Sequence, residues 1–94
     1  MEDSYRRIAI DILTTFETDN KTLKEIFNLK LKNKNLSDVT KNRCRVTVNE
    51  VMRLRGILDV FIVKFSSRLI KNIQLDALTI LRIASYEMLF DDLI

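Results

Sequence analysis

Apolar side chains recur at every third or fourth position along most of this chain, and no proline interrupts them. A helix completes a turn in 3.6 residues, so this spacing gathers apolar side chains on one stripe of its surface. Proline breaks helices more strongly than any other residue, and the 94 residues contain a single glycine. The pattern therefore predicts an all-α fold, a compact bundle of about five helices forming one domain over residues 1–94.

Five segments carry the helical spacing, at residues 4–16, 23–32, 38–55, 57–65 and 75–90. Thr22 and Glu25 form a capping-box pattern before the second segment, and Ser37 is the expected cap of the third. Gly56 is predicted to close the third helix, where a left-handed conformation is needed. The buried stripe of this third helix is expected to include Cys44, Val48, Val51 and Met52.

The last two predicted helices are the most apolar part of the chain. The fourth is apolar on nearly every side, which is typical of a helix in the middle of a bundle. The fifth is expected to pack through Leu78, Leu81, Ala84, Ser85 and Met88, while Ile80, Ile83, Leu89 and Phe90 fall outside this stripe. An open apolar patch of this kind favours self-association, so a homo-oligomer is expected. Because neither glycine nor proline follows the fifth helix, the polypeptide is expected to continue beyond Ile94.

Positive charge is concentrated in one part of the chain. Residues 21–55 hold ten lysines and arginines against three acidic residues, whereas residues 56–94 hold four against five. A basic segment beside a nearly neutral one is typical of a protein that binds a polyanion. The structural alternative is a charged helix surface that only keeps a small protein in solution.

The residue types needed for catalysis and metal binding are scarce. The chain has no histidine, so Cys44 has no imidazole to activate it and is expected to be a buried core thiol. A methyltransferase requires a strand followed by a glycine-rich turn, which one glycine does not supply. We therefore expect a chain that is not an enzyme by itself and uses no cofactor or metal. No apolar run approaches the roughly 20 residues that span a bilayer, so a cytoplasmic protein is expected.

Two motifs follow one another in the last third of the chain, Arg53-Leu54-Arg55-Gly56-Ile57-Leu58-Asp59 and Leu81-Arg82-Ile83-Ala84-Ser85-Tyr86-Glu87-Met88-Leu89-Phe90. Together they resemble the NusB-like helical domain, and the first is similar to the branch attached to ribosomal RNA cytosine methyltransferases. Ser4-Tyr5-Arg6-Arg7-Ile8-Ala9 resembles the arginine-bearing first helix of that family. The resemblance implies that a complete domain has further helices at its C-terminal end. It also places Glu50 where the family commonly has glycine.

The resemblance implies RNA binding, with phosphate contacts on the first helix. Helical geometry places Arg6 and Arg7 on the solvent side of this helix, and Arg45 and Arg53 on a polar face of the third. These four residues and Arg55 are the candidate RNA-binding residues.

Structural roles compete with RNA binding at some of these positions. The alternative for Arg7 is an ion pair with Asp11, and the alternative for Arg55 is to complement the dipole at the end of the third helix. Asp59 is expected to accept hydrogen bonds at a helix start, and Arg82 to serve mainly in packing.

The function implied by the resemblance is delivery of an S-adenosylmethionine-dependent methyltransferase domain to ribosomal RNA. One alternative is a free antitermination factor that binds nascent RNA together with a ribosomal protein. A different alternative is a protein-interaction module whose basic surface is incidental.

Overall fold

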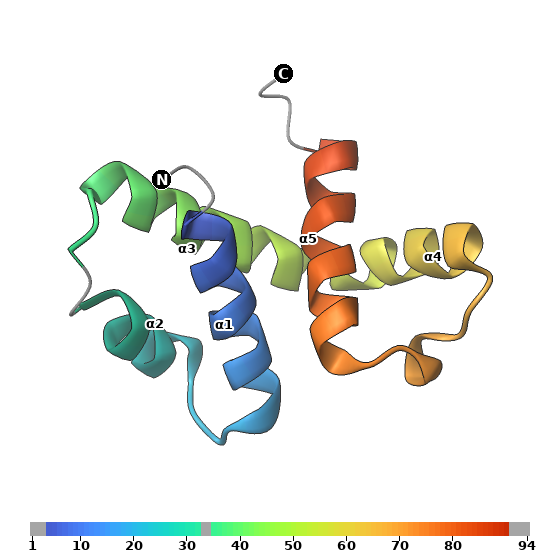
Figure 1. Cartoon of the computed structure of the whole chain (residues 1–94), viewed down its shortest axis with the longest axis horizontal. Coiled ribbons are helices and arrows are strands. Elements are labelled where there is room, and N and C mark those ends of the chain that lie inside the picture. The colour runs from blue at the N-terminus through green and yellow to red at the C-terminus, as the bar shows by residue number, and fades with distance from the viewer. Residues whose placement is uncertain (1–3, 33–34, 91–94) are drawn as a thin grey trace. The chain divides into compact units, whose positions relative to one another are not determined.

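A computed structural model describes residues 4–32 and 35–90 of the chain (Figure 1). These residues form five α-helices: α1 (Ser4–Thr18), α2 (Leu23–Lys32), α3 (Asp38–Arg53), α4 (Arg55–Ser66) and α5 (Leu75–Phe90). A short 3-10 turn, η1 (Ile70–Asn72), lies between α4 and α5. The described residues contain no strand, and the all-α prediction is confirmed. None of the described helices is both long enough and apolar enough to cross a membrane.

Two helices begin with the side-chain caps expected from the sequence. The backbone N–H of Thr22 donates to Glu25 Oε1 at 2.8 Å, and the N–H of Glu25 donates to Thr22 Oγ1 at 3.1 Å. This reciprocal pair is a capping box, and it pairs backbone donors that have no partner within the helix. At the start of α3, Ser37 Oγ accepts from the N–H of Thr40 at 3.1 Å. Both predicted caps are confirmed.

The chain divides into two compact units, one up to Val48 and one from Asn49 onward, so that α3 begins in the first and ends in the second. In the first unit α1 and α2 are in contact. The buried apolar side chains of this unit come from all three helices and are Tyr5, Ala9, Ile12, Leu13, Ile26, Leu31, Cys44 and Val48. Their spacing on each helix confirms that these stripes form the core.

In the second unit α5 lies against α4, which also contacts η1 (Figure 1). The buried apolar side chains here are Val51, Leu54, Leu58, Ile62, Leu78 and Ile83. Three polar residues of α5, Thr79, Arg82 and Ser85, are buried with them. The packed face of α5 therefore differs from the predicted stripe. Leu81 and Met88, which were assigned to that stripe, are 38% and 71% exposed.

The position of Gly56 differs from the prediction. Leu54 separates α3 from α4 with φ −97° and ψ 10°, and Gly56 is the second residue of α4. Among the described residues no glycine has a positive φ. The backbone hydrogen bonds from Leu54 to Glu50 and from Leu58 to Leu54, both 2.9 Å, carry the chain from one helix into the next without a left-handed residue. The residue that does adopt this conformation is Ser67, at φ 58°, where α4 ends.

Helix α4 is not covered on all sides, contrary to the expectation for the middle of a bundle. Leu58 and Ile62, one turn apart, are its buried residues, whereas Val60 and Phe65 are 68% and 72% exposed. Helix α4 therefore carries more apolar side chains than its contacts in this unit bury. The surplus leaves apolar surface on α4.

Candidate nucleic-acid interface

The first turns of α1 place a tyrosine in the core and two arginines outside it. Tyr5 is buried, and Arg6 and Arg7 are exposed, as the 100° rotation per residue predicts. The guanidinium carbon of Arg6 lies over the Tyr5 ring, 4.8 Å from its centroid. This distance is within the range of a cation–π contact. The Arg6 side chain thus has a defined position beside the ring.

A second arginine, Arg43 of α3, contacts the same ring. Its guanidinium carbon lies 4.9 Å from the Tyr5 centroid. Arg43 is not among the five candidates predicted from the sequence. The contact joins residues that are far apart in the sequence, so no local pattern indicates it.

The structural alternative for Arg7 was an ion pair with Asp11. In the part of the chain that the structure describes, Asp11 pairs instead with Lys30 of α2, whose Nζ lies 3.0 Å from Asp11 Oδ2. This pair links α1 to α2. The Asp11 carboxylate therefore does not explain a cation at Arg7, and a cation in a first turn opposes the helix dipole.

Helix α3 presents the polar face expected from its sequence: Asn42, Arg45, Asn49 and Arg53 are all exposed. Cys44, beside Arg45, is fully buried, which confirms its assignment to the core. Burial raises the pKa of the Cys44 thiol to about 11, although the positive charge of Arg45 acts in the opposite direction. A thiol with this pKa is protonated at neutral pH and is a poor nucleophile.

Arg53 is held by Glu50, one turn earlier in α3. Arg53 Nη2 donates to Glu50 Oε1 at 2.8 Å, and Nε donates to Oε2 at 3.1 Å. This hydrogen bonding lowers the pKa of the Glu50 carboxyl and raises the pKa of Arg53. The Glu50 carboxylate is thus directed toward Arg53. A phosphate at Arg53 would have to compete with this carboxylate.

Arg55 is the first residue of α4 and is partly buried. Helix α3 ends at Arg53, two residues before Arg55, so the structural alternative for Arg55 at the end of α3 stays a prediction. Arg6, Arg7 and Arg45 belong to the first unit, and Arg53 and Arg55 to the second. The five candidates therefore form two separate sets, and the first unit also contains Arg43.

An ion pair joins the two motifs in the last third of the chain. Arg82 Nε donates to Asp59 Oδ1 at 2.7 Å, and Nη2 donates to Oδ2 at 2.9 Å. The side chains are 8% and 24% exposed. Asp59 lies inside α4 and binds Arg82 of α5. The predicted role of Asp59 as an acceptor at a helix start was therefore wrong. Asp59 and Arg82 thus connect α4 to α5, which is a structural role for these two motif residues.

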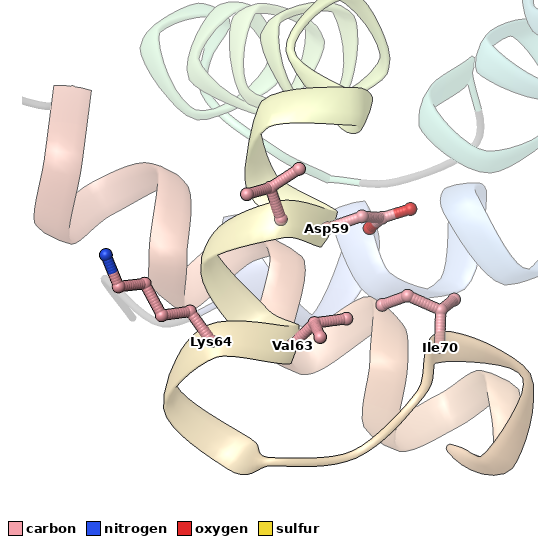
Figure 2. A pocket seen from close by; sticks show the side chains of 5 residues that line it. Asp59, Val63, Lys64 and Ile70 are labelled. Atoms are coloured by element: carbon pink, nitrogen blue, oxygen red, sulfur yellow. The ribbon is translucent and has the colours of Figure 1, made fainter.

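Two of the apolar hollows formed by the described residues lie in the second unit. The larger, about 440 Å³, is lined by Asp59, Val60, Val63, Lys64 and Ile70. Figure 2 shows Val63 of α4 and Ile70 of η1 on facing sides of this hollow, with the Lys64 ammonium pointing away. The smaller, about 240 Å³, lies between α4 and α5. None of the five candidate arginines lines either hollow.

No cluster of three or more potential metal-binding side chains occurs within residues 4–32 and 35–90. Asp59, the acidic residue that lines the larger hollow, forms an ion pair with Arg82. The arginines of α1 and α3 are therefore the best candidates for ligand binding.

The model of the NusB family matches residues 3–94. Neither the curated proteins nor the solved structures include a significant match to this chain.

Proposed function

The chain belongs to the NusB family, and from this membership we propose that it is an RNA-binding domain whose basic surface is formed by α1 and α3 of the first unit. The observation that carries the proposal is the arrangement at the start of α1. Two arginines are exposed there, at a place where a cation does not stabilise the helix, and one of them is held over a tyrosine ring.

The chemistry of arginine suits this role. Its planar guanidinium presents five N–H donors in a fork that matches the oxygen atoms of a phosphate. Such contacts fix a protein on the RNA backbone and carry little sequence information. The excess of lysine and arginine in residues 21–55 supplies the longer-range attraction.

A salt titration of RNA binding tests this proposal. Fluorescence anisotropy would measure the Kd of a labelled RNA hairpin for the wild type and for the Arg6→Ala, Arg7→Ala double variant. Each lost phosphate contact should reduce the slope of log K against log salt by about 0.7 to 0.9. We expect weaker binding and a slope lower by about 1 to 2 units for the double variant.

The matched control removes two exposed charges from the second unit, by Arg68→Ala with Lys71→Ala. It should leave the slope nearly unchanged. Coincident curves for the α1 double variant and the wild type would remove α1 from the RNA surface. No binding by the wild type at low salt would instead favour a protein-interaction module.

We further propose that this domain helps direct a ribosomal RNA cytosine methyltransferase to its target in the cytoplasm, and is not catalytic by itself. The motif Arg53-Leu54-Arg55-Gly56 supports this role, since it resembles that branch of the family. Translation of the gene beyond the codon for Ile94 would distinguish the two roles in this family. A cofactor-binding domain supports delivery of a methyltransferase, and a nearby stop codon supports a free antitermination factor.

A further inference from the structure

The larger apolar hollow, between α4 and η1, is not accounted for by RNA binding. Its volume is about 440 Å³, and Val60, Val63 and Ile70 supply its apolar lining. Val63 and Ile70 lie on facing sides of it (Figure 2), and Val60 is exposed. Pockets that bind ligands usually measure about 300 to 1,000 Å³. An apolar lining is unsuited to a phosphodiester backbone, which binds to positive charge.

Three exposed cations belong to the two elements that form this hollow and to the segment that connects them. Lys64 is in α4, Arg68 is in the connection, and Lys71 is in η1. No acidic residue occurs in residues 60–75. In the described part of the chain none of the three cations forms an ion pair. An apolar hollow accompanied by this charge favours a partner that is both apolar and acidic.

Asp59 also lines the hollow, but it does not offset the positive charge. Its two carboxylate oxygens accept from Arg82 Nε and Nη2 at 2.7 Å and 2.9 Å, so its charge is already balanced. The next acidic residue along the chain is Asp76, in the first turn of α5, where it complements the dipole of that helix. The local excess of positive charge is therefore available to a partner.

We propose that this hollow, together with Lys64, Arg68 and Lys71, is a docking site for an amphipathic helix of a partner protein that carries acidic side chains beside its apolar face. Side chains three and four apart project from one face of a helix, so an apolar pair enters the hollow while neighbouring carboxylates meet the cations. A hollow fits projecting side chains better than the flat surface of a bilayer does, which favours a partner helix over a membrane. The site lies in the second unit, and it does not depend on the RNA surface proposed for the first.

Two synthetic peptides that differ only in charge test the site. Each is an amphipathic helix of about 18 residues, long enough to be helical, with leucine on one face and a fluorophore at one end. One peptide carries glutamate on its other face, and the second carries lysine. Fluorescence anisotropy would measure the Kd of each peptide for the full chain. The glutamate peptide should bind at least about tenfold more tightly, and added salt should weaken its binding.

Charge variants test the contribution of the three cations. Lys64→Gln, Arg68→Gln and Lys71→Gln should each raise the Kd of the glutamate peptide about two- to fivefold, and the triple variant about tenfold or more. Lys24→Gln is the matched control, because it removes an exposed positive charge from α2 of the first unit. It should change the Kd less than about twofold.

An apolar variant tests the hollow itself. Val60→Ser removes part of the lining without changing charge and should raise the Kd about tenfold. Ile57→Ser is its control, since Ile57 is an exposed apolar residue of α4 that does not line the hollow. All substituted positions are exposed, and circular dichroism would check that each variant is folded.

Several results would overturn the docking site. Equal affinities for the two peptides would contradict charge complementarity, and wild-type affinity of Val60→Ser would show that the hollow takes no side chain. Absence of binding to the glutamate peptide would also overturn it. Binding to vesicles of phosphatidylcholine and phosphatidylglycerol would then identify a membrane surface, whereas a lower mass of Val60→Ser by light scattering would identify a second copy. None of these results bears on RNA binding, which the α1 double variant tests separately.

Discussion

At the scale of single residues, Asp59 and Arg82 form a bidentate ion pair between residues 23 positions apart in the second unit. It lies mostly out of solvent and joins α4 to α5. Removing one partner from such a pair leaves an unpaired charge, which costs more than the pair itself contributes. The pair is therefore expected to be sensitive to single substitution and tolerant of joint replacement.

We expect Arg82→Met to lower the free energy of unfolding by roughly 2 to 4 kcal/mol, below the upper end for buried pairs because Asp59 is partly exposed. The double variant Asp59→Leu, Arg82→Met should recover most of this loss, since two apolar side chains leave no unpaired charge. Urea unfolding measures both. A single variant as stable as the wild type would show that the pair does not hold α4 to α5.

The second residue-scale prediction concerns Cys44, whose thiol has a pKa raised to about 11 by burial, from an ordinary value of 9.0. Between these pH values the folded protein keeps a proton that the unfolded chain releases. Stability should therefore fall as pH rises from about 9 to 11. Urea unfolding across this range should show a steeper decline for the wild type than for Cys44→Ala. Equal declines would mean that the thiol is not held protonated by the fold.

At the scale of elements, the chain's one glycine and the left-handed residue at the end of α4 occupy different positions. Gly56 lies inside α4, where a Cβ would meet no atom within 4 Å, and Ser67 at the end of α4 has φ 58°. Gly56→Ala should stabilise the protein by about 0.5 to 1 kcal/mol, because alanine favours helix. Thermal unfolding measures the change. If this variant were less stable than the wild type, Gly56 would have to adopt a left-handed conformation, contrary to its place inside α4.

Ser67→Gly is the complementary variant. Glycine adopts a positive φ without steric cost, whereas other residues pay about 1 kcal/mol or more. We expect a rise in stability of about 0.5 to 1 kcal/mol, read from the same thermal unfolding. A Ser67→Gly protein less stable than the wild type would contradict the left-handed end of α4.

Helix boundaries were the part of the fold most accessible from the sequence. Residues 23–32 and 75–90 coincide with α2 and α5, because caps and apolar spacing are local signals. The face that α5 buries was not accessible, since it depends on Arg82 reaching Asp59 across 23 positions. The same reason applies to Arg43, whose contact with Tyr5 is not encoded near either residue. Exposure of Arg6, Arg7 and Arg45 followed from periodicity, but their binding to RNA stays a prediction.

At the scale of the whole molecule, apolar surface on α4 and α5 should promote self-association. Phe65 and Met88 line the smaller hollow and are 72% and 71% exposed. The ring centroids of Phe61 and Phe65 lie 4.5 Å apart, and Phe61 lines the same hollow. Since α5 itself offers exposed apolar side chains, a second copy is a suitable partner for this surface.

We expect light scattering to show a mass above 11.1 kDa that increases with protein concentration. Phe65→Lys with Met88→Lys should return the mass to that of the monomer, because charged side chains oppose burial of this surface. Ile57→Lys, on another exposed position of α4, is the matched control. A monomer at all concentrations would contradict self-association.

The proposed function requires that RNA binds the first unit through α1 and α3. Backbone amide chemical shifts, recorded by NMR while an RNA hairpin is added, test it most directly because every described residue reports separately. The largest shift changes are expected near Arg6, Arg7, Arg43 and Arg45, with small changes along α5. Changes concentrated on α4 and α5, with α1 unaffected, would contradict it.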